Sequence, residues 1–183
     1  RGLSVSTILL IGRNGQVGGE LQRTLAPLGK LIAFDRHALD LADADAIRAA
    51  IRSIHPDIIV NAAAYTAVDQ AETENAVAMS INGKAPGIMA EEARSTGAWL
   101  VHYSTDYVFD GTKNTAYEEG DTPNPLNVYG RSKLAGEQAI QAVGGRYTIL
   151  RTSWVYGRRG KNFLNTILRL AQEKEELRIV ADQ

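Results

Sequence analysis

Tyr129 and Lys133 have the types and spacing needed for acid–base chemistry. They stand four positions apart in the segment NVYGRSKLAGE, residues 127–137, where a helical pattern begins. Residues four apart share one face of a helix. A free tyrosine has a pKa near ~10, and a nearby cation favours its phenolate form. The pair is therefore a candidate for proton exchange with a substrate oxygen. The alternative is a core tyrosine beside a solvated lysine.

Two hydroxyl side chains stand at the end of a predicted strand in HYSTDYVFDG, residues 102–111. Ligands of open α/β sheets bind beyond the carboxyl ends of the strands. Ser104 or Thr105 could therefore donate a hydrogen bond to a substrate carbonyl there. The alternative is that both hydroxyls cap the following turn.

A glycine-rich loop follows the first predicted strand. In IGRNGQVGGE, residues 11–20, glycines occur at 12, 15 and 18, and a helical pattern follows. Such a loop lets backbone N–H groups and a helix N-terminus face a pyrophosphate. Asp35 ends the next strand, near the ~20-residue offset of an acid that contacts an adenosine ribose. Arg36 could instead receive the 2′-phosphate of NADP, so the choice between NADH and NADPH stays open.

The elements that must position these residues alternate between strands and helices. Strands are expected at 6–12, 30–35, 57–64, 98–106, 146–153 and 176–181, and helices at 16–29, 43–55, 75–96, 129–143 and 162–175. We expect Asp43 to cap the second helix and residues 107–128 to form a loop. The strands are continuous apolar runs, as in a parallel sheet covered on both faces. The pattern predicts an α/β fold with a doubly wound parallel sheet, of the Rossmann type that binds NAD(P).

Composition and charge exclude several classes of protein. The chain has 183 residues, no cysteine and a net charge of -1. Disulfides and thiolate chemistry are therefore excluded, and nothing in the overall charge favours nucleic acid. No apolar run approaches the ~20 residues of a membrane span, and the first residues do not match a signal peptide. We expect a cytoplasmic protein that binds neither nucleic acid nor membrane.

Five segments together resemble a known superfamily. They are the glycine loop, NAAAYTAVDQAE (61–72), STDYVFDG (104–111), PLNVYGRSKLAGE (125–137) and LRTSWVYG (150–157). The chain is similar to the extended short-chain dehydrogenases/reductases and, within them, to the family of dTDP-4-dehydrorhamnose reductases. The resemblance implies reduction of the 4-keto group of a dTDP-sugar by hydride transfer from NADPH or NADH, in the synthesis of dTDP-rhamnose for cell-surface polysaccharides.

The resemblance also implies roles for individual residues. Tyr129 would protonate the incipient alkoxide, Lys133 would lower the pKa of Tyr129 and bind the nicotinamide ribose, and Thr105 would hydrogen-bond the keto oxygen. The implied cofactor-binding residues are Gly12, Asn14, Gly15, Gln16, Val17, Gly18, Asp35, Asp40, Leu41, Ala62, Ala63, Ala64, Tyr129 and Lys133. The implied substrate-binding residues are Thr66, Val68, Thr105, Asp106, Tyr107, Tyr129 and Trp154.

Members of this family continue well past the point where this sequence stops. We therefore expect residues 1–183 to be an NAD(P)-binding domain with the beginning of a substrate-binding part, the rest of which is absent. Some members hold Mg²⁺ at a dimer contact, and Glu20 stands where one ligand could fall. No metal site is predicted, and a homodimer stays open.

Two other functions stay open on the residues alone. The first is a nucleotide-sugar epimerase or dehydratase with bound NAD, because Asp106 follows Thr105 as an acid would for elimination. The second is a non-catalytic, NADP-binding regulatory subunit such as that of methionine adenosyltransferase, which resembles these reductases. The presence of Thr105, Tyr129 and Lys133 together favours the reductase.

Overall fold

The sheet has five parallel strands in the order β2-β1-β3-β4-β5. The computed structural model describes residues 5–160, 162–174, 176–177 and 179. The strands are β1 (Thr7–Ile11), β2 (Lys30–Phe34), β3 (Ile58–Asn61), β4 (Trp99–Thr105) and β5 (Arg146–Thr152). The order reverses at β1, which lies between β2 and β3, so a switch point faces the carboxyl ends of β1 and β3. The prediction of a doubly wound parallel α/β sheet is confirmed.

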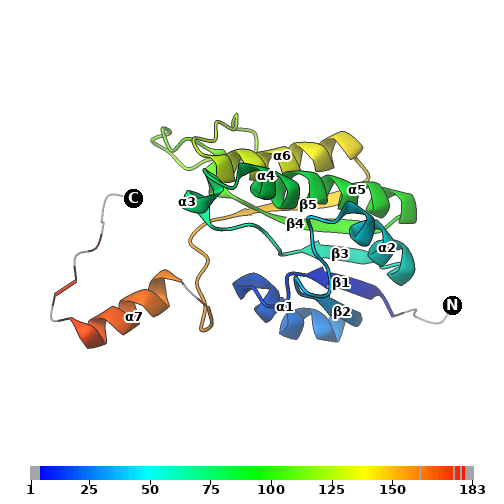
Figure 1. The fold of residues 1–183 in the computed structure, drawn as a ribbon, viewed down its shortest axis with the longest axis horizontal. Helices are drawn as coiled ribbons and strands as arrows, with labels where there is room; N and C mark the ends of the chain where they lie inside the picture. Colours follow the sequence, from blue (N-terminus) through cyan, green and yellow to red (C-terminus); the bar gives the residue numbers. More distant parts are fainter. Residues whose placement is uncertain (1–4, 161, 175, 178, 180–183) are drawn as a thin grey trace.

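Helices cover the two faces of the sheet unequally (Figure 1). The helices are α1 (Gln16–Leu25), α2 (Ala44–Ile54), α3 (Val68–Ala71), α4 (Asn75–Ala78), α5 (Ala85–Thr96), α6 (Val128–Val143) and α7 (Phe163–Glu173). On one face, α2, α5 and α6 pack on the larger core cluster, which includes Leu9, Ile59 and Leu100. On the other face, α1 packs on Ile8 and Leu10. Helix α7 lies apart from the sheet (Figure 1).

Side-chain hydrogen bonds cap the N-termini of α2 and α6. Asp43 caps α2 by accepting from the backbone N–H groups of residues 45 and 46, as expected. Asn127 caps α6 in the same way, accepting from Gly130 N at 2.7 Å. Further along α6, a side chain at Gly136 would stand 2.2 Å from the backbone oxygen of Asn82. Only glycine permits that approach, so the cap and the close packing together fix the helix face that carries Tyr129 and Lys133.

Several boundaries differ from those expected. The predicted helix 75–96 is interrupted by a π-helical turn at Met79–Lys84. The predicted helix 16–29 ends at Leu25, and a 3₁₀ turn at Ala26–Leu28 with proline in its first turn follows. The strand expected at 57–64 ends at Asn61, because residues 62–64 leave the sheet.

The sixth strand, expected at 176–181, is not found. Residues 176, 177 and 179 are not in a strand, and the rest of that segment lies outside the described residues. A strand needs a partner for its backbone groups, and in the described residues neither edge strand, β2 nor β5, pairs with this segment.

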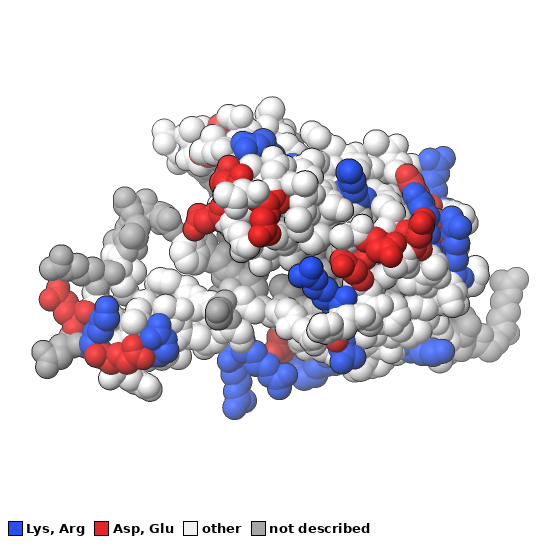
Figure 2. Space-filling model, in the orientation of Figure 1, with Lys and Arg blue, Asp and Glu red and all other residues white. Residues whose placement is uncertain are grey.

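The surface carries charges of both signs. Basic and acidic side chains are interspersed on the face shown in Figure 2, in keeping with the net charge of -1. Ion pairs join neighbouring elements, as between Arg48 on α2 and Glu91 on α5, whose charged atoms are 2.8 Å apart. Among the helices in the described ranges, none has the length and apolar character to cross a bilayer.

Candidate active site

A cavity of about 670 Å³ lies beyond the carboxyl ends of the strands. It is where ligands bind in open α/β sheets. Most of the predicted cofactor residues line it, together with two predicted substrate residues, Thr66 and Tyr129. The predicted residues that line the cavity are Gly12, Asn14, Gly15, Gln16, Val17, Asp35, Asp40, Leu41, Ala62, Ala63, Ala64, Thr66, Tyr129 and Lys133. The glycine loop and the tyrosine–lysine pair, more than a hundred residues apart in the sequence, therefore share one cavity.

The glycine loop forms a cradle that larger residues could not build. Gly12 has φ +92°, and a side chain there would meet the backbone nitrogen of Ala63 at 2.7 Å. A side chain at Gly18 would stand 2.1 Å from the oxygen of Gly12. Gly18 does not line the cavity, and it serves to pack α1 against the loop. The cap residue of α1 is Gly15, which has no side chain to cover the N-terminus of the helix, and both Gly15 and Val17 line the cavity.

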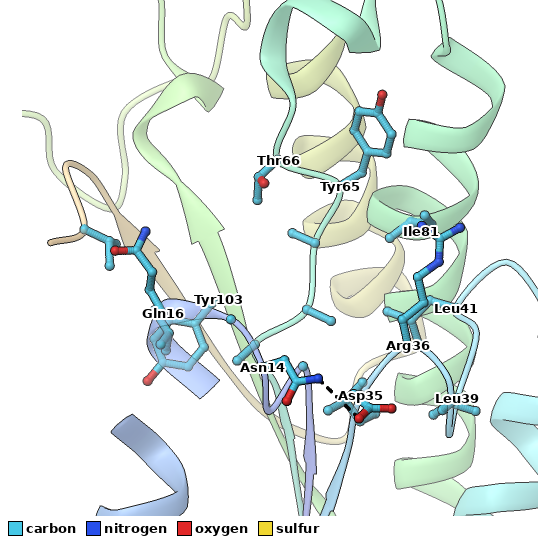
Figure 3. Close-up of a pocket in the computed structure, with 18 of the residues that line it drawn as sticks. Asn14, Gln16, Asp35, Arg36, Leu39, Leu41, Tyr65, Thr66, Ile81 and Tyr103 are labelled. Carbon is cyan, nitrogen blue, oxygen red and sulfur yellow. Dashed lines mark hydrogen bonds between the residues drawn. The ribbon is translucent and has the colours of Figure 1, made fainter. Parts of the chain in front are cut away.

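Asp35 already accepts hydrogen bonds from its own surroundings. One oxygen accepts from the backbone N–H groups of His37 and Ala38, both at 3.1 Å. The other accepts from the Asn14 amide at 3.2 Å (Figure 3) and lies 3.5 Å from Arg13 Nε. The bond from Ala38, with the others, holds the pKa of the Asp35 carboxyl below its usual range. The carboxylate is thus fixed in direction before any ligand binds.

Arg36 offers the opposite charge beside that carboxylate. Its side chain lines the cavity and extends away from Asp35 in Figure 3. The residue is exposed. The wall near the end of β2 therefore presents a fixed carboxylate and an exposed guanidinium next to one another. This is the pair of groups that could distinguish a ribose hydroxyl from a phosphate.

Tyr129 is half-buried at the start of α6. Its ring packs edge-on against Tyr107, with 5.6 Å between the centroids. Burial raises the pKa of the Tyr129 phenol above its ordinary value, and a hydrogen bond with the Thr105 side chain acts in the other direction. The expected lowering of this pKa by Lys133 is therefore not met in this structure. Burial has the largest influence on the phenol, and Lys133 Nζ donates instead to the backbone oxygen of Tyr103.

Lys133 lies beneath the cavity with only 2% of its surface exposed. Its Nζ donates to the backbone oxygen of Tyr103 at 2.6 Å and lies 3.3 Å from His102 Nε2. Burial lowers the pKa of Lys133 to about 8, although Glu137 acts to raise it. A lysine in this position can exchange its proton near neutral pH.

The two hydroxyl side chains at the end of β4, Ser104 and Thr105, have different surroundings. Ser104 points inward and donates to Glu137 at 2.5 Å, and Glu137 also binds Arg151 at 2.6 Å. Thr105 remains beside Tyr129, where it donates to Asp106 Oδ1 at 3.1 Å and accepts from Tyr107 N at 3.2 Å. Of the two candidates, the structure therefore places Thr105 next to the phenol. The turn-capping alternative also holds for Thr105.

A second cavity of about 660 Å³ is lined by three of the predicted substrate residues, Asp106, Tyr107 and Trp154. Trp154 is 64% exposed, has φ 49° and packs edge-on against Phe163, at the start of α7. Val68 and Thr105 line neither cavity, and the other predicted substrate residues are divided between the two cavities.

Sequence reasoning did not find the buried polar residues under the site. His102 and Asn61 are fully buried, and they meet through the pairing of β4 with β3. They are 41 positions apart, and no local pattern indicates their contact. The sequence indicates them in one way only: each is a polar residue in an otherwise apolar strand. A buried polar residue must have a hydrogen-bond partner.

Comparison with known proteins gives a consistent result. The family model described as the RmlD substrate binding domain matches residues 6–183. The chain belongs to this family. The dTDP-4-dehydrorhamnose reductase of Escherichia coli K12 is 53% identical over 180 residues, covering 96% of this chain and 60% of that protein. The Burkholderia thailandensis reductase is 52% identical over 96% of this chain and 59% of its own length.

Solved structures agree with these relatives. The Bacillus anthracis dTDP-4-dehydrorhamnose reductase, solved in complex with NADP, superposes with a TM-score of 0.94 and 42% identity, covering 98% of this chain and 64% of that one. More distant structures, such as the UDP-glucose 4-epimerase of Thermus thermophilus with a TM-score of 0.78 and 23% identity, share the fold. The chain spans about 60% of the length of the curated relatives it matches.

Proposed function

We propose that this chain is the cofactor-binding and catalytic part of a dTDP-4-dehydrorhamnose reductase. The observation that carries the proposal is the shared cavity, which is lined by both the glycine cradle and the Tyr129–Lys133 pair. Thr105 lies next to the phenol at the end of β4. The similarity to named reductases at about half identity supports the same activity.

The residues present fit NADPH or NADH. The glycine cradle excludes side chains where a pyrophosphate would approach, and the N-terminus of α1, which follows the cradle, would offer it backbone donors. Asp35 and Arg36 would hold the adenosine ribose or its phosphate, and Lys133 would bind the ribose at the other end. When bound, the reduced nicotinamide supplies the hydride that reduces the keto carbon.

Side chains of this chain would supply the proton that the keto oxygen takes up. Thr105 and Tyr129 would hydrogen-bond the keto oxygen and polarise the carbonyl. As the oxygen gains negative charge, the Tyr129 O–H bond breaks and the proton passes to that oxygen, which becomes the product hydroxyl. A proton donor must be protonated before the reaction. The Tyr129 phenol is protonated at neutral pH because its ordinary pKa is well above 7 and burial raises it further.

The sugar and its nucleotide would occupy the second cavity. It begins at Asp106 and Tyr107, which adjoin Thr105, and Trp154 forms part of its wall. We propose that Trp154 stacks against the substrate, because an exposed aromatic ring offers an apolar face to a sugar or base. The domain boundaries and the cytoplasmic location expected from the sequence stay predictions, and a homodimer stays open.

Turnover of the intact protein tests the proposal. The substrate is dTDP-4-dehydro-L-rhamnose generated in situ, and loss of NADPH absorbance is followed with product identification. Formation of dTDP-L-rhamnose with NADPH consumed in equal amount is the expected result. Cofactor binding without turnover, or NAD that co-purifies and is regenerated during the reaction, would contradict the reductase and favour the regulatory or epimerase function respectively.

A further inference from the structure

Three buried polar side chains form a line beneath the candidate catalytic pair. Lys133 comes from α6, His102 from β4 and Asn61 from β3, and their exposed fractions are 2%, 0% and 0%. Lys133 Nζ lies 3.3 Å from His102 Nε2, and His102 Nδ1 lies 3.1 Å from Asn61 Nδ2. Each contact constrains which atom carries a proton, because groups buried this deeply must pair donors with acceptors.

The orientation of the Asn61 amide is set by the backbone. Its Oδ1 accepts from the N–H of Ala63 at 3.2 Å. Turning the amide over would place its NH₂ group against that N–H, so two donors would face each other. The amide nitrogen therefore faces the imidazole. Because an amide nitrogen only donates, Nδ1 of His102 must accept.

The tautomer of His102 follows from this bond. A neutral imidazole that accepts at Nδ1 carries its hydrogen on Nε2. The ring is neutral because burial, together with the charge of Lys133, holds the pKa of His102 well below its usual range. The Nε2–H group then points at Lys133 Nζ. An ammonium has three donors and no acceptor, whereas a neutral amine has a lone pair that can accept from Nε2–H.

We propose that His102, fixed as its Nε2–H tautomer by Asn61, is a positioning residue that destabilises the ammonium form of Lys133. The other groups around Lys133 Nζ also affect the equilibrium between its ammonium and neutral amine forms. The Tyr103 carbonyl accepts from either form, and Glu137, one turn further along α6, favours the ammonium. Tyr129 lies one turn earlier on the same helix. The relevance of this equilibrium to catalysis rests on the proposed function. The effect of His102 on the protonation of Lys133 does not.

This arrangement gives Lys133 a proton that it releases easily. A step that requires the ammonium would therefore be lost as the pH rises, and it would be lost at a lower pH than if Lys133 had the pKa of an ordinary lysine. It also links the ammonium to the loop that borders the cavity, because Ala63, which orients Asn61, lies in that loop.

The tautomer can be read directly by long-range ¹H–¹⁵N NMR correlation, which distinguishes protonated from bare ring nitrogens. The chain has three histidines, and His37 and His55 are exposed references for the buried ring. We expect His102 to show a bare Nδ1 and a protonated Nε2 at neutral pH. A protonated Nδ1 would overturn the proposal. The measurement needs no substrate, so its outcome is separate from that of the turnover test.

The effect on Lys133 is tested with Asn61→Asp. A carboxylate at this position accepts from both Ala63 N–H and Nδ1–H, so the tautomer reverses and Nε2 becomes an acceptor for the ammonium. We expect the titration midpoint of Lys133, followed by the ¹³C shift of its ε-methylene group, to rise by about one pH unit. An unchanged midpoint in a folded variant would overturn the proposal.

A double variant separates the tautomer from the added charge. A glutamine at position 102 can accept from the ammonium whatever residue occupies position 61, so His102→Gln alone should also raise the midpoint. Asn61→Asp in the His102→Gln background should then add little further shift. If Asn61→Asp instead adds its full shift in that background, the new carboxylate acts by charge alone and the proposal fails. If Asn61→Asp does not fold, the tautomer spectrum of the unaltered chain still decides.

Discussion

The two ends of the cavity beside the glycine loop, with the residues just behind them, stabilise charge in different ways. At the end near β2, Asp35, Arg13 and Arg36 are half-buried or exposed, and water shares in their solvation. At the other end, Lys133, Glu137 and His102 are at most 2% exposed, so protein groups alone satisfy them. Charges in the first region should therefore affect ligand affinity, whereas charges in the second should affect the stability of the fold and the chemistry together.

The largest effect is expected from the ion pair between the buried Glu137 and the half-buried Arg151. Glu137 accepts from both Arg151 nitrogens, at 3.0 and 2.6 Å, and from Ser104. Glu137→Gln leaves the guanidinium without its counter-charge, and we expect the free energy of unfolding to fall by about 3 kcal/mol. Urea unfolding measures this.

The matched control is the exposed pair Arg169–Glu173 on α7, whose side chains are 60% and 52% exposed. Glu173→Gln should change the free energy of unfolding by less than about 0.5 kcal/mol. Equal losses in the two variants would show that burial of the carboxylate does not set the strength of these two ion pairs.

The next effect is a dependence of stability on pH that belongs to Lys133. Its pKa is about 8 in the folded chain, against an ordinary 10.5. Between these values the unfolded chain binds more protons than the folded one, so the free energy of unfolding rises with pH, and below about 8 the buried ammonium is a constant cost.

Lys133→Met removes the titrating group and the cost of burying it. The variant should be more stable than the original chain at pH 7, and the difference should shrink by roughly 3 kcal/mol towards pH 10.5. Urea unfolding of both proteins across this range gives the comparison. Parallel stability profiles would contradict a depressed pKa for Lys133.

The smallest effect is expected at the exposed end. Arg36→Ala should weaken NADPH binding by about five- to tenfold, because one exposed charge contact to a 2′-phosphate is lost. NADH has no such phosphate, so its dissociation constant should hardly change. Fluorescence titration with both cofactors measures the ratio. Equal weakening of both would place Arg36 away from the 2′ position.

The framework could be predicted from the sequence because its signals are local. Apolar runs identified the five strands of the sheet, and Asp43 marked the start of α2. The expected strand at 176–181 was wrong for residues 176, 177 and 179, because an apolar run shows strand propensity but not whether a neighbouring strand is available to pair. The π-helical turn at Met79–Lys84 has no local signature either.

The sequence motifs predicted the residues that line the site but not the buried residues that contact them. Tyr129 and Lys133 were identified by their spacing, and the glycine loop by its pattern. The ring that faces Lys133 was missed, since His102 lies 31 positions away and meets it only when α6 packs on β4. The direction of the Tyr129 pKa was also missed, because burial depends on the whole fold.

Tyr129 is proposed to give the proton in a cavity that also binds the cofactor. The direct test is Tyr129→Phe in the intact protein, with turnover of the dTDP-4-keto sugar and NADPH affinity measured side by side. We predict that turnover falls by about a thousandfold while the NADPH dissociation constant changes less than about twofold. Turnover at the unaltered rate would contradict the assignment of Tyr129 as the proton donor.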